Sequence, residues 1–469
     1  MNLNAVKTFI SDNFLLETEQ ANILYHNYAK DLSIIDYHNH LSPYIIAKNK
    51  PFQSITKAWL QGDHYKWRAM RANGVDEHCI TGEASEYKKF EKWAETVPKT
   101  LRNPLFHWTQ LELKRYFNIE TILDASTANK IYHLANSILK EKTPVQLLED
   151  MKVELICTTD DPIDNLSYHK LISKSDNNIR VLPTFRSDSL FLINQKNFLD
   201  YIKKLSRCVG FSIFNLENLL EAIDKRIDFF NDNGCCISDY GIGGPLAMAD
   251  FKEEEIASIV KRRLSSQTIS QADVYKYRSF LLIFLGKKYS EKGWVQQYHL
   301  GAIRDNNEQL LQERGADIGC DSVGDYCFGD ALSKLFNCLN LENKLPKTIA
   351  YNLNSAHNEV FASMMGNFNK DFKPSKMQWG AAWWYLDQKD GIEKHLNTLS
   401  NIGLLSNFIG MVSDSRSFLS FPRHEYFRRV LCNLIGNDIK KGLLPNDIVF
   451  FGKMVQDICY NNVKAYFNF

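Results

Sequence analysis

The sequence lacks the hallmarks of membrane, secreted and nucleic-acid-binding proteins. Its longest apolar stretch, Phe280 to Leu285, is far shorter than the roughly 20 residues of a membrane-spanning helix. The first residues, MNLNAVK, contain neither the basic nor the apolar region of a signal peptide. The net charge is only +1, with lysine and arginine scattered along the chain. We therefore expect neither nucleic acid nor a membrane as a partner.

Cysteine pairs of the Cys-x-x-Cys type are also absent. The ten cysteines are spread from Cys79 to Cys459, which is typical of reduced, mostly buried thiols. We therefore expect a cytoplasmic protein.

Nucleotide-binding motifs are missing as well. The nearest glycine-rich segment, GIGGP at 241–245, lacks the Gly-x-Gly-x-x-Gly spacing and ends in proline, and no P-loop is present. We therefore expect no nucleotide cofactor.

Short β-rich runs alternate with longer amphipathic stretches, which indicates a parallel α/β architecture. The expected helices include 216–231, 251–265 and 273–292. The expected strands are 32–38, 153–158, 180–185, 235–238, 295–299, 348–353 and 408–412. We predict one (β/α)8 TIM-type barrel domain over 1–469, with a helical insertion or cap at about 45–150. An eighth strand is not legible, and an open doubly wound sheet is the alternative.

His38 and His40 stand at the end of the first expected strand and are the most informative pair in the chain. Residues two apart in a strand point to one face, with Cα atoms roughly 6.6 Å apart. Two imidazoles on one face can bind a single divalent ion. The alternative is a chance pair on a surface strand.

Polar residues also stand at the ends of other expected strands, among them Arg186, Asp239, His299 and Asp414. In parallel barrels the carboxyl ends of the strands carry the active site. For any single residue, the alternative is a polar group that caps the next helix.

Asp414 is the natural third metal ligand or general base, because a carboxylate beside a cation stays ionised. Its alternative is an N-cap for a segment that begins at Ser415. Arg186 and Arg416 could pair with an anionic substrate or form internal salt bridges. His299 could be a further ligand, a hydrogen-bond donor to the site or a core histidine.

A second cluster, GDHYKWRAMRANG at 62–74, lies in the expected insertion. It is either a solvated helix start or part of a cap that reaches into the barrel mouth. In the second case, Tyr65 could relay a proton between neighbouring substrate oxygens.

Several segments resemble the uronate isomerase (glucuronate isomerase) family, a divergent branch of the amidohydrolase superfamily, over essentially the whole chain. They are DYHNHLSP (36–43), DHYKWRAMR (63–71), NPLFHW (103–108), CTTDDP (157–162), PTFR (183–186), HLGAIR (299–304), SDSRSF (413–418) and PRHEYFRR (422–429).

The resemblance implies an aldose–ketose isomerase that interconverts D-glucuronate with D-fructuronate and D-galacturonate with D-tagaturonate. Moving a carbonyl from C1 to C2 requires a base at C2, stabilisation of a cis-enediol and a grip on the C6 carboxylate. We assign catalysis to Asp414, Tyr65 and Arg416. Substrate binding is assigned to Arg186, His64, Arg416 and His299.

The expected cofactor is one divalent ion held by His38, His40 and Asp414. Such N/O ligation suits Zn²⁺, with Mn²⁺ or Co²⁺ as alternatives. Dinuclear amidohydrolases carry a metal-bridging lysine at the fourth strand end. We expect Arg186 at that end and no histidine at the fifth, which implies at most one ion.

Two other functions stay open from the sequence. One is a mononuclear metal-dependent hydrolase of a cyclic amide or lactone, and the other is a non-catalytic sugar-acid binding protein. A small-molecule hexuronate is the expected partner, and a homo-oligomer is left open.

Overall fold

The computed structural model describes residues 9–246, 248–370 and 374–469, so the N-terminal segment MNLNAVK lies outside the described residues. Its strands form two sheets. The first sheet has the order β1 (Ile34–Asp36), β2 (Val153–Cys157), β3 (Arg180–Leu182). The second has the order β4 (Phe185–Arg186), β5 (Ile237–Gly243), β6 (Val295–Ile303), β8 (Thr348–Asn352), β9 (Met377–Trp379). Both ladders are parallel, and only β7 (Ser322–Val323) runs antiparallel, against β6.

The two sheets are parts of one curved wall. β3 and β4 are consecutive, and a bridge between Asp160 and Phe185 continues the pairing from the first sheet to the second. At the other seam, the amide of Asp414 donates to the carbonyl of His38 (3.2 Å), and the amide of His40 donates to the carbonyl of Ser415 (2.9 Å). The wall therefore closes as the expected (β/α)8 barrel, with residues 180–186 in the third position and 408–414 in the eighth.

Two expectations about strands are wrong. The segment 408–412 occupies a barrel position but is not a strand. Gly410 has a φ of 77°, which is not a strand conformation. Its backbone also lies so close to Ile458 that a Cβ would be 2.6 Å from the carbonyl oxygen of that residue. The strand that the sequence did not reveal is β9, whose three residues are too few to show a period.

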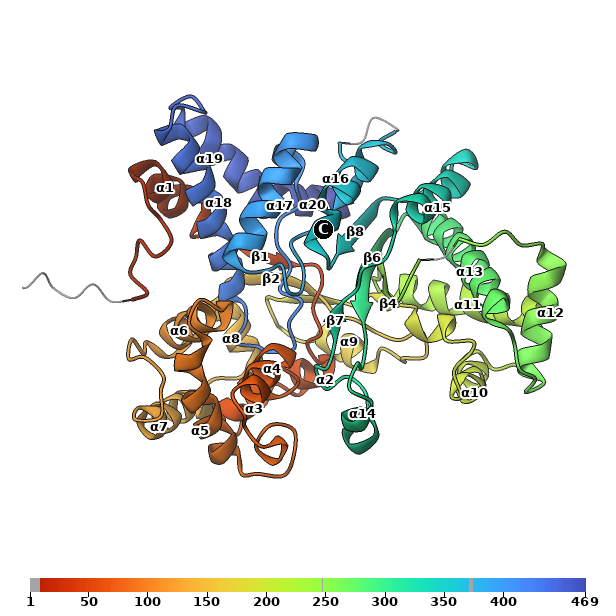
Figure 1. Ribbon diagram of the computed structural model, residues 1–469, viewed down its shortest axis with the longest axis horizontal. Coiled ribbons are helices and arrows are strands. Elements are labelled where there is room, and N and C mark those ends of the chain that lie inside the picture. The colour runs from red at the N-terminus through yellow and green to blue at the C-terminus, as the bar shows by residue number, and fades with distance from the viewer. Residues whose placement is uncertain (1–8, 247, 371–373) are drawn as a thin grey trace, which may run out of the picture.

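Between β1 and β2 the described chain forms helices and no strands, as expected for 45–150 (Figure 1, red to orange). Local capping explains the starts of several of these helices, for example the Asp63 side chain that accepts from the amide of Lys66. The single-domain assignment and the role of this insertion as a cap stay predictions. Its α-helices are α2 (Pro43–Lys48), α3 (Ile55–Leu60), α4 (His64–Ala72), α5 (Glu86–Thr96), α6 (Pro104–Phe117), α7 (Ala128–Lys140) and α8 (Pro144–Asp150).

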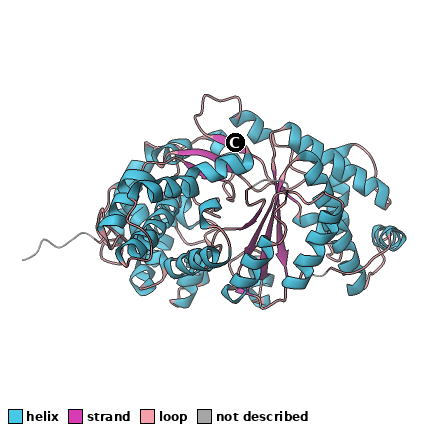
Figure 2. Cartoon of the chain, turned by 90° about the horizontal axis from the view of Figure 1, so that it is seen from above, coloured by secondary structure: helices cyan, strands magenta, loops and turns pink. Residues whose placement is uncertain are grey.

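The remaining helices surround the strands (Figure 2). α11 (Leu216–Asp232), α12 (Glu253–Leu264) and α13 (Gln271–Lys292) agree with the expected helices to within a few residues. The others are α1 (Glu19–Leu24), α9 (Ser167–Ile172), α10 (Phe198–Val209), α14 (Glu308–Arg314), α15 (Gly329–Leu341), α16 (Asn358–Gly366), α17 (Lys389–Ile402), α18 (Pro422–Lys440), α19 (Ile448–Gln456) and α20 (Asn462–Phe467).

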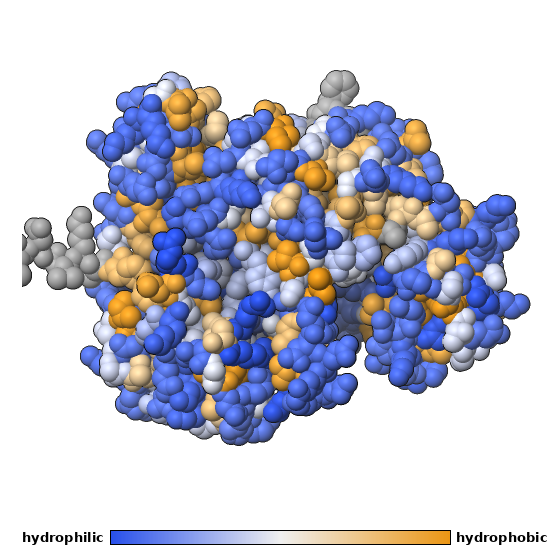
Figure 3. Space-filling model, viewed as in Figure 1, coloured by the Kyte–Doolittle hydropathy of each residue, from blue (hydrophilic) through white to orange (hydrophobic). Residues whose placement is uncertain are grey.

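Several barrel strands, among them β1, β6, β8 and β9, are almost completely buried. Every residue of β6 except Ile303 is buried, as expected for a parallel strand that faces the barrel interior on one side and helices on the other. On the face in Figure 3, hydrophilic residues predominate and hydrophobic ones lie in small groups. Among the described residues, no helix is both long and apolar enough to cross a membrane.

The contact between α1 and α18 gives a test of the packing. A Cβ on Gly436 of α18 would lie 2.4 Å from the amide nitrogen of Ala21 in α1. Gly366 is also a helical glycine, in α16, but a Cβ there would meet nothing within 4 Å. We expect Gly436→Ala to lower the free energy of unfolding by about 1–2 kcal/mol, because overpacking outweighs the gain in helix propensity. Gly366→Ala is the matched control and should not lower the apparent Tm. An unchanged or higher Tm for Gly436→Ala would contradict this packing.

Candidate active site

A cavity of about 530 Å³ lies at the carboxyl ends of the barrel strands. The barrel contributes residues that follow β1, end β4 and β5, and lie on the closing segment 408–414. The insertion contributes the first turn of α4. All the predicted site residues line this one cavity: His38, His40, His64, Tyr65, Arg186, His299, Asp414 and Arg416.

His38, His40 and Asp414 form the first candidate ligand group. Oδ1 of Asp414 lies 3.2 Å from Nε2 of each histidine. Two further contacts fix the group, because Trp383 Nε1 donates to Asp414 Oδ2 (2.8 Å) and Thr159 Oγ1 lies 2.8 Å from His40 Nδ1. Such outer contacts orient ligands toward a metal. No helix begins at Ser415, so Asp414 is not the N-cap that the alternative required.

The pKa values of two of the three residues agree with a ligand set. Burial acts to lower the pKa of His38, but the Asp239 charge and the hydrogen bond with Asp414 outweigh it and raise that pKa, so a bound cation would have to displace a proton from His38. Burial lowers the pKa of His40 to about 3, which leaves its imidazole neutral. Burial acts to raise the pKa of Asp414, but hydrogen bonds with His38 and His40 outweigh it and hold that pKa well below its usual range. A neutral imidazole and an ionised carboxylate are the states in which these side chains bind metals.

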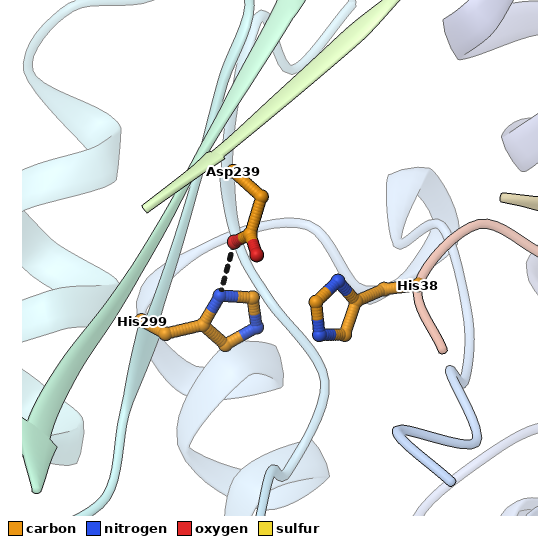
Figure 4. Close-up of side chains that lie close together, drawn as sticks. All are labelled: His38, Asp239 and His299. Atoms are coloured by element: carbon orange, nitrogen blue, oxygen red, sulfur yellow. Dashed lines mark hydrogen bonds and ion pairs between the residues drawn. The ribbon is translucent and has the colours of Figure 1, made fainter. Parts of the chain in front are cut away.

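His38, Asp239 and His299 form a second group of possible ligands (Figure 4). Nδ1 of His299 lies 2.7 Å from Asp239 Oδ1, and the His38 and His299 ring centroids are 4.3 Å apart. His299 Nε2 is buried without a hydrogen-bond partner in the structure. An unpartnered nitrogen beside His38 is the kind of atom that a bound cation would satisfy.

The order of the strands contradicts the expectation that Arg186 ends the fourth barrel strand and that the fifth carries no histidine. Arg186 ends the third barrel strand, not the fourth, and Asp239 lies on the fourth. His299 lies on β6, the fifth strand, so the expectation of no histidine there is wrong. The expected strand 180–185 was already the third along the chain, so the numbering assumed an additional strand before it that the described residues do not contain.

Arg186 is already paired with two carboxylates. Its Nε donates to Asp188 Oδ2 (2.9 Å) and its Nη1 to Asp239 Oδ2 (2.8 Å). Burial opposes ionisation of Asp239, but the Arg186 charge and His299 hold the pKa of Asp239 well below its usual range. Arg186 therefore forms internal salt bridges with both carboxylates, and its role in substrate binding stays a prediction.

Arg416 and His64 share one acidic neighbour, Asp317. Arg416 Nη2 lies 3.2 Å from Asp317 Oδ2, and His64 Nε2 lies 3.6 Å from its Oδ1. The Asp317 side chain is 59% exposed, so an anion from solvent can compete for its place.

Tyr65 enters the cavity from α4. Its hydroxyl lies 2.9 and 2.8 Å from the two carboxylate oxygens of Asp387. The Arg423 guanidinium lies 5.4 Å from the centroid of the Tyr65 ring. The cluster at 62–74 is thus a helix start whose first turn reaches the cavity.

Sequence reasoning missed several residues of the site. Asp387 supports Tyr65, and the cavity wall also contains Asp188, Arg278, Arg304, Asp317, Trp383, Trp384 and Arg423. Arg304 and Arg423 stand in segments that resemble the uronate isomerase family, which was the one signal available for them. Asp387 follows the unrecognised β9, so nothing placed it at a strand end.

The barrel and the ligand groups at its strand ends define the class, a (β/α)8-barrel protein with a candidate metal centre. A family model described as glucuronate isomerase matches residues 6–467. The chain therefore belongs to the glucuronate isomerase family.

Individual relatives agree over the full length. A uronate isomerase of Flavobacterium johnsoniae is 50% identical over 467 residues, which cover 99% of this chain and all of that protein. A crystal structure of a uronate isomerase from Thermotoga maritima has a TM-score of 0.93 at 33% identity, covering 98% of this chain and 99% of that one. A glucuronate isomerase structure from Caulobacter crescentus, at 24% identity, shares the fold, with a TM-score of 0.89 and coverage of 97% and 96%. Neither the hydrolase nor the non-catalytic alternative finds support among these proteins.

The histidine pair gives a direct test of the metal centre. We expect His38→Ala and His40→Asn each to lower bound metal below one ion per chain, because each removes a nitrogen ligand. Metal analysis of the purified, reconstituted proteins measures this. His133→Asn, at an exposed position of α7, is the control and should keep the wild-type metal content. Full metal occupancy in both cavity variants would show that the group His38, His40, Asp414 is not the site.

Proposed function

We propose that this protein is a uronate isomerase that interconverts D-glucuronate with D-fructuronate, and D-galacturonate with D-tagaturonate. The supporting observation is the full-length match to the glucuronate isomerase family in a chain whose cavity unites candidate ligands, acid–base groups and cations. An assay on glucuronate, coupled to a ketouronate reductase, tests the proposal. Absence of turnover on both uronates by metal-loaded protein would overturn it.

One divalent ion is the proposed cofactor, with Zn²⁺ preferred and Mn²⁺ or Co²⁺ as alternatives. His38, His40 and Asp414 would hold it. His299 is a candidate further ligand, because its buried Nε2 has no hydrogen-bond partner in the structure. A second ion is disfavoured because both oxygens of Asp239 already accept hydrogen bonds, from His299 and Arg186. When bound, such an ion polarises substrate oxygen atoms as a Lewis acid.

Asp414 is the proposed base. Isomerisation of the open-chain aldose moves one hydrogen from C2 to C1 and one proton from O2 to O1. Asp414 would take the C2 hydrogen as a proton and return it to C1 on the same face of a planar cis-enediol. Its low pKa keeps the carboxylate ionised at neutral pH. Tyr65 would carry the second proton from O2 to O1.

Cationic groups in the cavity explain the choice of an acid sugar. Arg416 is the stronger candidate for binding the C6 carboxylate, because its one carboxylate partner, Asp317, is largely exposed. Arg186 is already neutralised by two carboxylates, the buried Asp239 and the half-buried Asp188, so in this proposal it orders the cavity wall. His64 and His299 stay candidates for contacts with substrate hydroxyls. The proton-transfer role assigned to Arg416 is the alternative to carboxylate binding.

We further infer that the enzyme works in the cytoplasm. All ten cysteines are free in the structure, as suits a reducing compartment. A hexuronate is its small-molecule partner in this proposal.

Substrate charge tests the role of Arg416. A cation left without its anion should make glucose a poorer substrate than glucuronate by roughly 30- to several-thousand-fold, since such a loss costs about 2–5 kcal/mol. We expect Arg416→Gln to shrink this ratio of kcat/KM mainly through glucuronate, while Arg207→Gln, on the exposed side of α10, should leave it unchanged. Comparable turnover of glucose and glucuronate by the wild-type enzyme would show that Arg416 does not bind the C6 carboxylate of the substrate.

The Asp414 assignment is tested by a change that keeps shape but removes basicity. We expect Asp414→Asn to lower kcat by at least the ~10²–10⁴-fold typical of a lost general base. Asp200→Asn, at an exposed position of α10, is the control. Metal analysis separates loss of the base from loss of the ion.

Isotope transfer gives a second view of the same step. In D₂O, one-base transfer through a cis-enediol should place some solvent deuterium at C1 of the product. Complete retention of the C2 hydrogen, together with full activity in Asp414→Asn, would contradict the mechanism.

A further inference from the structure

Tyr65 stands in the wall between two cavities. One is the 530 Å³ cavity of the candidate active site, and the other, of about 820 Å³, lies between the insertion and the segment 385–390. Tyr65 lines both, whereas Asp387 lines only the second. The aspartate is therefore behind the tyrosine as seen from the active site.

The contact between the two side chains fixes the direction of the phenolic hydrogen. Tyr65 is the only donor of the pair when Asp387 is ionised, and its hydroxyl lies within 2.9 Å of both carboxylate oxygens. The hydrogen therefore points at Asp387. The phenolic oxygen also accepts a long hydrogen bond from the amide of Tyr385 (3.4 Å). A proton from the active-site side would take the acceptor position that this contact leaves.

Asp387 is otherwise enclosed. It is 4% exposed, and its nearest cation is Arg423 of α18, whose Nη1 lies 4.0 Å from Oδ2. Arg423 is itself held by the carbonyl of Ser413 and lies over the rings of Tyr65 and Trp108. A buried carboxylate with one distant cation is well placed to receive a proton.

We propose that Asp387 is a positioning residue that orients Tyr65 and receives its phenolic proton while Tyr65 takes the proton of the substrate O2 hydroxyl. In the return step, Asp387 gives that proton back to the phenolic oxygen, and Tyr65 delivers a proton to O1. Two O–H bonds break and two form in each direction, with no change of charge over the cycle. The inference rests on the proposed uronate isomerase activity.

The electrostatics of the pair agree with this assignment. Burial raises the pKa of Asp387 to about 6, against the opposing charge of Arg423, so the carboxylate is ionised at neutral pH and still basic enough to be protonated. Burial and the Asp387 charge raise the pKa of Tyr65 well above its usual value, which keeps the phenol protonated at rest.

A purely structural role is the competing explanation. Asp387 precedes α17 and could merely attach the segment after β9 to α4. A structural role predicts losses of stability and of substrate binding that do not depend on the Tyr65 hydroxyl. A role through Tyr65 predicts an effect on kcat that disappears when that hydroxyl is absent.

A double-mutant cycle on the metal-loaded enzyme separates the two explanations. We expect Asp387→Asn to lower kcat by roughly 10- to 100-fold with KM within about threefold, since an amide accepts the hydrogen bond but takes up no proton. In the Tyr65→Phe background the same change should cost less than about threefold. Losses that multiply, or a wild-type kcat for Asp387→Asn, would overturn the inference. Asp390→Asn, which lines the same second cavity at an exposed position of α17, is the control and should keep the wild-type kcat.

A second variant keeps the test decisive if Asp387→Asn does not fold. In Asp387→Ala, formate should enter through the second cavity and restore kcat at least about fivefold, because it supplies the missing carboxylate. Folded Asp387→Ala that does not respond to formate would overturn the inference. Failure of the wild-type enzyme to isomerise either uronate would instead overturn the proposed function, so the two failures are distinguishable.

Discussion

The closure of the barrel is the constraint on which the candidate site depends. The backbone hydrogen bonds between the segment after β1 and residues 414–415 bring the histidine pair and Asp414 together from nearly opposite ends of the chain. The buried side chain of Asp36 reinforces this seam by accepting from the amide of Ser413 (2.8 Å). Asp414 itself has a φ of 46°, a conformation that aspartate tolerates better than most residues and that turns its carboxylate toward the histidines. Without closure, Asp414 would not meet the two histidines.

Charge balance is the second organising feature. Among the described residues of the cavity, Arg186 is matched by Asp188 and Asp239, while Arg416 has only the exposed Asp317. Interactions between charges are strong in a cavity from which water is partly excluded, so a fully matched arginine gains little from another anion. Arg186 is thus held by two carboxylates, whereas Arg416 is the cation that the proposed function assigns to the substrate carboxylate.

The sequence predicted those residues of the site that a short stretch of sequence is enough to identify. The pair His38 and His40 was recognised by its spacing, although β1 ends at Asp36 and both histidines lie just after the strand. Asp414 stands out as a polar residue after an apolar run. Arg186 and His299 were found in the same way, but their strand numbers were one too high, because an additional strand was assumed before 180–185 and the described residues contain none there. Asp387 was not found at all, since its partner Tyr65 is 322 residues away and the preceding strand β9 has only three residues. Contacts between distant segments leave no local pattern.

The segment that follows β9 shows how the barrel and the insertion come to act on one cavity. Trp383 donates to Asp414 on the barrel side, and four residues later Asp387 accepts from Tyr65 on the insertion side. The insertion is held in place independently, because Arg68 and Arg71 of α4 donate to the carbonyls of Asp321 and Ile318. One short stretch of chain therefore orients both the candidate base and the candidate proton carrier. A change in its conformation would move the two groups together, so in the proposed mechanism transfer at carbon and transfer at oxygen would be coupled through this segment.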